Sequence, residues 1–153
     1  MLNDIIEIFF LSLTPIGELR ASIPYGLLFT NLDPMLVVFI SIIGNVFIGI
    51  LILYILPNIV DHIRKLYYLN VLLNMIFKRT LKRGRIINNL KYYGLIIFVS
   101  IPLPLTGVWT GAIAAFLFGL SKHKSILAIT YGVLISSTIV TIMTLYGINL
   151  YGN

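Results

Sequence analysis

Two charges of opposite sign stand two residues apart in the stretch PIGELRASIP, residues 15–24, within an otherwise apolar region. Glu18 can exchange a proton, and Arg20 stays charged and offers a fork of N–H donors that suits a phosphate or a carboxylate. On a regular helix, residues two apart point about 200° apart and do not face each other as residues four apart do. We therefore expect either an irregular backbone here or a partner for each charge in another element.

A second group of polar residues lies in the stretch SIPLPLTGVWTG, residues 100–111. Thr106, Trp109 and Thr110 offer hydroxyls and an indole N–H. Gly107 and Gly111 permit tight turning and close approach. Prolines in both stretches lack the N–H that would bond a preceding carbonyl, so the freed oxygens need protein partners or a wet cavity. These prolines are Pro24, Pro102 and Pro104. The two stretches together could line a polar cavity, or the second could merely close a turn.

Polar residues also interrupt two long apolar segments. Asn45 follows Gly44, which suits close helix packing with an interhelical hydrogen bond as well as contact with a substrate. Four hydroxyl residues repeat at spacings of 7, 4 and 3, and we expect them to bond their own preceding carbonyls. They are Thr130, Ser137, Thr141 and Thr144. His62 and His123 show no metal-site spacing, so we expect neither a metal nor another cofactor.

The composition indicates an integral membrane protein. Of 153 residues, 59% are hydrophobic and 10% are charged, and the mean hydropathy is +1.02. Three segments without Asp, Glu, Lys or Arg exceed the roughly 20 residues that cross a hydrocarbon core: 34–60, 92–121 and 125–153. The absence of cysteine excludes disulfides and thiolate chemistry. Without a nucleophile and base pair or a cofactor loop, we expect no enzymatic activity.

The chain divides into elements of different character. Residues 34–57 and 125–148 predict transmembrane helices, whereas regions 14–32 and 92–120 contain proline and glycine and predict broken helical hairpins. Residues 58–91 mix leucine and isoleucine with eight cations, which favours an amphipathic helix on anionic lipid headgroups over nucleic-acid binding. Asp4 and Glu7 stand where a signal peptide would be basic, so we expect the N-terminal segment to remain in the mature protein.

The basic residues favour one of two topologies. If both hairpins crossed the membrane, the basic residues of 58–91 would lie opposite Lys122 and Lys124. If both are re-entrant, every basic residue except Arg20 lies on one side, as the positive-inside rule favours. We predict the re-entrant arrangement in the cell membrane, with the basic linker in the cytoplasm and both termini outside. Because two crossings and two hairpins enclose little volume, we also expect a homodimer.

The two halves follow the same order of elements. Residues 1–57 and 92–153 each contain an interfacial segment, a broken hairpin and one uncharged helix. The helix begins 19 residues after Pro15 in the first half and 21 residues after Pro104 in the second. Because the halves start from opposite sides, we predict an all-α inverted repeat, an arrangement that secondary transporters use to build a midplane site.

The motifs PIGELRASIPYGL, the GN of the next helix and IPLPLTGVWTGAIAAFLFGL resemble the small multidrug export family of prokaryotic membrane proteins. That family is similar to the DedA superfamily, in which two re-entrant hairpins carry acidic and basic residues at their tips. The resemblance implies a proton-linked transporter or a translocase of anionic lipid such as polyprenyl phosphate. The family motif positions in this chain are Glu18, Arg20, Pro24, Pro102, Pro104, Thr106, Gly107, Trp109 and Gly111. DedA proteins also have an arginine in the second hairpin, whereas in this chain Trp109 and Thr110 occupy that region.

Three functions follow as hypotheses. In the first, Arg20 binds an anionic group such as a lipid phosphate, and Glu18 carries a proton whose presence changes that affinity. In the second, the protein exports cationic amphiphiles that bind Glu18 directly. In the third, it is a membrane scaffold without a transport cycle, and the charges serve stability alone. A charge at bilayer depth costs about 2.5–3.5 kcal/mol on insertion scales, which favours a functional role over a structural ion pair or an Arg20 that reaches the interface.

Overall fold

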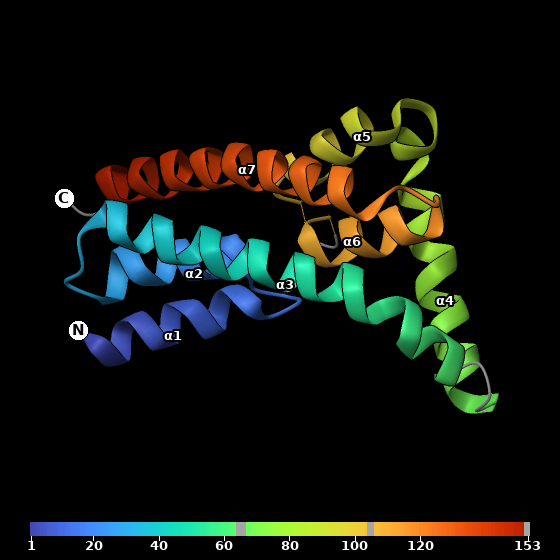
Figure 1. Ribbon diagram of the computed structural model, residues 1–153. Helices are drawn as coiled ribbons and strands as arrows, with labels where there is room; N and C mark the ends of the chain where they lie inside the picture. Colours follow the sequence, from blue (N-terminus) through green and yellow to red (C-terminus); the bar gives the residue numbers. More distant parts are fainter. Residues whose placement is uncertain (64–66, 104–105, 152–153) are drawn as a thin grey trace.

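The computed structural model describes residues 1–63, 67–103 and 106–151, and within these ranges the chain is entirely helical (Figure 1). This confirms the all-α class. The helices are α1 (Leu2–Leu13), α2 (Glu18–Phe29), α3 (Pro34–Ile63), α4 (Tyr67–Arg83), α5 (Arg85–Ser100), α6 (Val108–Leu117) and α7 (Lys122–Tyr151).

Two helices, α3 and α7, form the long axis of the molecule and run in opposite directions (Figure 1). Their apolar segments Pro34–Val60 and Lys122–Leu150 have mean hydropathies of 2.9 and 2.0 and are long enough to cross a membrane. This agrees with the helices predicted at 34–57 and 125–148. Both extend further, because α3 continues past Pro57 and α7 begins at Lys122.

The first hairpin consists of α1 and α2, joined by a turn at residues 14–17. Both arms pack against the first half of α3 through an apolar cluster around Ile8, Val37 and Ile40. The predicted boundaries 14–32 therefore miss the first arm. We expected an interfacial segment ahead of the first hairpin, but the buried side of α1 packs on α3.

The second hairpin consists of α5 and α6, joined by residues 101–107. A kink at Lys91, where φ is +49°, turns the chain from the basic linker into the second part of α5. The main core gathers around this hairpin and includes Leu95, Phe98 and Val108. The order α5, α6, α7 thus repeats the order α1, α2, α3. That the halves are an inverted repeat and that the hairpins are re-entrant remain predictions from the sequence.

The tips of both hairpins reach the middle of α3. An added Cβ on Gly44 would meet the side chain of Ser12, near the end of α1, and an added Cβ on Gly49 would lie 2.7 Å from a methyl group of Val108, at the start of α6. The hairpins approach this level from opposite ends of the molecule (Figure 1). The two tips therefore meet halfway along the long helices.

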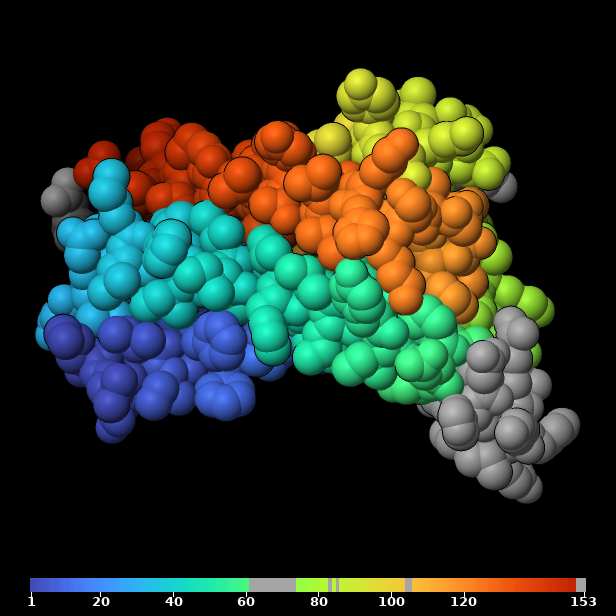
Figure 2. Space-filling view, in the orientation of Figure 1, coloured from blue at the N-terminus to red at the C-terminus, as the bar shows by residue number. Residues whose placement is uncertain are grey.

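The two ends of the molecule carry different residues. Both termini and the turn between α2 and α3 lie at one end, and α4 and the start of α7 lie at the other (Figure 1). Figure 2 shows α3 and α7 side by side along the length between these ends. At the end that holds the termini, Asp4 lies in the first turn of α1 and Asp33 directly precedes α3, whereas Lys122 and Lys124 lie in the first turn of α7, at the other end. Which end faces the cytoplasm stays a prediction.

Candidate functional site

The carboxylate of Glu18 is buried where the two tips meet, with 7% of the residue exposed. Its Oε1 accepts a hydrogen bond from the backbone N–H of Trp109, at 3.2 Å, in the first turn of α6. Helix N-termini carry free N–H groups and a partial positive charge, which suits a carboxylate. Glu18 therefore joins the start of α2 to the start of α6.

The backbone around this contact is irregular on both sides. Glu18 has a φ of +47°, which is uncommon for a residue with a side chain and costs of the order of 1–3 kcal/mol. Gly107 has a φ of +150°, and a Cβ placed there would lie 2.7 Å from the carboxyl carbon of Glu18. Only glycine accommodates both the conformation and the carboxylate. The irregular backbone expected near PIGELRASIP is thus present at Glu18.

Arg20 lies beside Glu18 and also contacts the second tip. Its Nη2 donates a hydrogen bond to the backbone carbonyl of Thr106 and lies 3.8 Å from Oε2 of Glu18. Each charge therefore has a partner in the other hairpin, as expected, and the two also attract each other. The Arg20 side chain is 24% exposed, against 9% for that of Glu18.

A cavity of about 310 Å³ opens next to Arg20. Its lining comes from three parts of the chain, namely α2, the loop after α5 and the second half of α7. The lining residues are Arg20, Pro24, Pro102, Val140, Met143 and Thr144. The wall is largely apolar and carries one cationic group, so it suits an amphiphilic anion.

Trp109 forms a second hydrogen bond between the tips of the two hairpins. Its indole N–H donates to the carbonyl of Leu13, at 3.1 Å, where α1 ends. Trp109 therefore contacts both arms of the first hairpin: its backbone N–H donates to Glu18 at the start of α2, and its indole N–H donates to Leu13 at the end of α1. Trp109 is a contact between the hairpins, and it is not among the residues that line the cavity beside Arg20.

Several predicted site residues lie in the tips without facing this cavity. The hydroxyl of Thr106 bonds within its own loop, 2.7 Å from the carbonyl of Leu103. That of Thr110 lies 3.4 Å from the carbonyl of Gly107. Gly111 allows α6 to approach α5, because a Cβ there would lie 2.7 Å from Val99. Pro104 lies outside the described residues.

Asn45 belongs to the packing of the first half. Its Nδ2 donates to the carbonyl of Ser12, at 3.0 Å, and the residue is fully buried. Gly44 and Asn45 therefore hold α1 against α3, which agrees with the helix-packing alternative. The hydroxyls along α7 also bond preceding carbonyls as expected: Thr144, for example, donates to Val140 at 2.8 Å.

Sequence reasoning missed some residues that complete the site. Val140 and Met143 line the Arg20 cavity from α7, and no pattern in the sequence distinguishes them from other apolar residues. Leu13 contributes only a backbone carbonyl, which side-chain chemistry cannot reveal. Thr144 was detectable, because it belongs to the series of hydroxyl residues.

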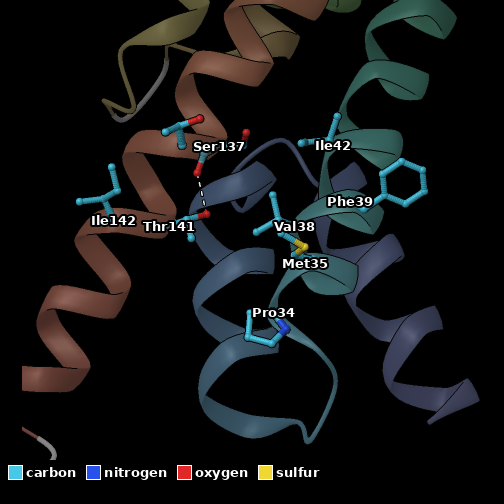
Figure 3. A pocket seen from close by; sticks show the side chains of 9 residues that line it. Pro34, Met35, Val38, Phe39, Ile42, Ser137, Thr141 and Ile142 are labelled. Carbon is cyan, nitrogen blue, oxygen red and sulfur yellow. Dashed lines mark hydrogen bonds between the residues drawn. The ribbon is translucent and has the colours of Figure 1, made fainter.

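A larger groove of about 400 Å³ lies between α3 and α7 and reaches Pro34, where α3 begins (Figure 3). Met35, Val38 and Phe39 line it from α3, and Ser137 and Thr141 line it from α7. Thr141 donates to the carbonyl of Ser137, at 2.7 Å, so its hydroxyl is satisfied within the helix. Because the lining carries no charged side chain, the groove offers mainly apolar contact, with hydroxyl oxygens on the α7 side.

These features define a class: an all-helical membrane protein in which two hairpins meet around a buried acid and a partly exposed base. Within that class, the chain belongs to the family described as "Putative small multi-drug export protein", whose family model matches residues 18–139. Comparisons with curated proteins and with solved structures give no match. The matched range includes both charges and the whole second tip. The resemblance to small multidrug export proteins is thereby confirmed, and the similarity to DedA proteins stays a prediction.

Proposed function

We propose that this membrane protein is a transporter that binds an anionic amphiphile, such as a lipid phosphate, at Arg20. The observation that carries the proposal is the unequal exposure of the two charges. Arg20 borders the cavity, whereas the Glu18 carboxylate is enclosed by Gly107 and Trp109. A cationic drug that binds Glu18 would have to reach a buried carboxylate whose Oε1 already accepts the N–H of Trp109 and whose Oε2 lies 3.8 Å from the guanidinium of Arg20. An anion can approach Arg20 without breaking the hydrogen bond from Trp109.

Glu18 acts as the proton carrier in this proposal. Ionised Glu18 attracts Arg20 across 3.8 Å and so competes with an incoming anion for the guanidinium. Protonation removes the competing charge and weakens the contact with the start of α6. Proton uptake and anion binding therefore favour each other, and this coupling acts equally in both directions.

The apolar cavity wall accounts for the rest of the ligand. Val140 and Met143 of α7 contribute apolar surface, as do Pro24 of α2 and Pro102 of the loop after α5. An alkyl chain attached to the anionic group can leave the cavity towards the lipid beside α7. A free inorganic anion would gain nothing from this wall, so we expect an amphiphile to bind more tightly.

Export of cationic drugs is the second candidate, and the family description favours it. Anion transport needs the positive charge of Arg20, whereas export of cationic drugs needs the negative charge of Glu18. Native mass spectrometry of the purified protein with added phosphatidylglycerol tests the first, and titration with tetraphenylphosphonium tests the second. The anion proposal expects Arg20→Ala to lose at least one bound phosphatidylglycerol. Exposed Lys124, in the first turn of α7 and outside both the cavity and the basic linker, provides the control, because Lys124→Ala should keep that lipid.

The opposite pattern would overturn the anion proposal. If Arg20→Ala retains phosphatidylglycerol like the wild type, while Glu18→Gln alone loses tetraphenylphosphonium, the site takes cations. If neither ligand binds above the level seen with phosphatidylcholine, and both variants only lower the melting temperature, the protein is a scaffold. Arg20→Lys keeps the charge without the planar fork, and we expect it to bind the phosphate more weakly than the wild type.

A further inference from the structure

Three side-chain oxygens on fully buried residues in the first half of the molecule have no hydrogen-bond partner among the described residues. They are the hydroxyls of Ser22 and Ser41 and the amide oxygen of Asn45. A buried polar group left without a partner costs about 1–3 kcal/mol. Three such oxygens on the packed helices α2 and α3 therefore indicate a place where a further ligand binds.

The helix register brings the three oxygens to one seam between α2 and α3. Gly26 of α2 packs against Val37 of α3, and the two helices run in opposite directions. One turn further along each helix, Ser22 comes opposite Ser41, because residues four apart share a face. Another turn places Asn45 level with Glu18, at the start of α2.

The surroundings of this seam favour a positive charge. Asn45 donates its Nδ2 to the carbonyl of Ser12, which leaves its Oδ1 to accept or coordinate. Ser12 lies in the last turn of α1, where helix carbonyls carry a partial negative charge. Arg20 points about 200° away from Ser22 on α2 and borders the cavity on the α7 side. The seam and the anion cavity thus lie on opposite faces of α2.

We propose that the oxygens of Ser22, Ser41 and Asn45 bind a small monovalent cation of the size of Na⁺. Hydroxyl and amide oxygens are hard ligands without charge, whereas Mg²⁺ and Ca²⁺ sites rely on carboxylates. Secondary transporters commonly hold coupling ions next to broken helices and helix C-terminal ends. The role of the cation as a coupling ion rests on the proposed transport function, but its binding does not.

Thermal unfolding of the detergent-purified protein tests the site without any transport assay. The melting temperature is followed by circular dichroism in NaCl and in choline chloride at equal ionic strength. A ligand that binds only the folded state raises the melting temperature as its concentration rises. We expect a stabilisation that grows with the NaCl concentration and is absent in choline chloride.

Ser41→Ala removes one ligand oxygen without breaking a hydrogen bond between described residues, and Ser22→Ala provides a second variant of the same kind. We expect each to raise the half-saturating Na⁺ concentration about tenfold, the equivalent of about 1.4 kcal/mol. Ser125→Ala is the matched control, because Ser125 is equally buried and unpaired but lies in the first turn of α7. It should respond to Na⁺ like the wild type.

Arg20→Ala separates this inference from the proposed function. It should lose the anion yet keep the Na⁺ response, because it leaves the seam intact. Equal melting temperatures of the wild type in NaCl and choline chloride would overturn the inference. So would equal Na⁺ responses of Ser41→Ala and Ser125→Ala.

Discussion

Glu18 accepts the backbone N–H of Trp109 at 3.2 Å, across 91 positions of the chain. This bond joins the first residue of α2 to the first turn of α6, and so links the two hairpins at their tips. The more accessible partner, Arg20, borders a cavity beside the same tips. The acid is thus enclosed between the hairpins while the base is available to a ligand.

Glu18→Gln should remove the pH dependence of anion binding. In the wild type, ionised Glu18 competes for Arg20, so we expect affinity for phosphatidylglycerol to rise as the pH falls and Glu18 takes up a proton. Glutamine has nearly the same shape and can still accept the N–H of Trp109, but it stays neutral. The variant should bind tightly at every pH, measured by native mass spectrometry.

Glu7→Gln provides the control for this measurement. Glu7 is an exposed acid of α1 that accepts a hydrogen bond from Tyr25, away from the tips. Its replacement should leave the pH dependence of the wild type unchanged. A Glu18→Gln variant whose affinity still varies with pH like that of the wild type would exclude Glu18 as the proton carrier.

Gly107→Ala should destabilise the contact between the hairpins. The positive φ of +150° alone costs about 1–3 kcal/mol for a residue with a side chain, and the added methyl group would also collide with the Glu18 carboxylate. Thermal unfolding in detergent measures the loss. Gly147→Ala is the matched control, because a Cβ there would meet no atom within 4 Å beyond its chain neighbours and the backbone of its own helix, and α7 is helical at this position. Alanine should be neutral or stabilise by up to about 1 kcal/mol there. If Gly107→Ala and Gly147→Ala changed the melting temperature equally, the close contact between Gly107 and Glu18 would be contradicted.

Trp109→Phe should weaken the second link between the tips. The change removes the hydrogen bond from the indole N–H to Leu13 and leaves that carbonyl without its partner, a loss of about 1–3 kcal/mol in the free energy of unfolding. Circular dichroism is the suitable measurement, since the chain has one tryptophan and the variant has none. Tyr131→Phe, at a 59% exposed residue of α7, should leave stability unchanged. A Trp109→Phe variant as stable as the wild type would show that this bond contributes nothing.

The long helices and the broken stretches could be predicted because they depend on local composition. Apolar runs without charge predict spans wherever they occur. Pro15 and Pro102 do lie where helices are interrupted. Pro24 and Pro57, however, lie inside α2 and α3. The first arm of the first hairpin was missed for the same reason. Residues 2–13 are amphipathic, and such a pattern fits a helix at a membrane interface as well as one that packs on α3.

The sequence by itself determined that Glu18 and Arg20 stand in an apolar region and that each needs a partner. Only the tertiary structure decided which partners they have, since Trp109 and Thr106 lie 91 and 86 positions away. It also decided that Glu18 is enclosed and that Arg20 borders a cavity. Exposure of a side chain depends on the packing of distant segments, such as α6 and α7 here, and no local pattern encodes that packing.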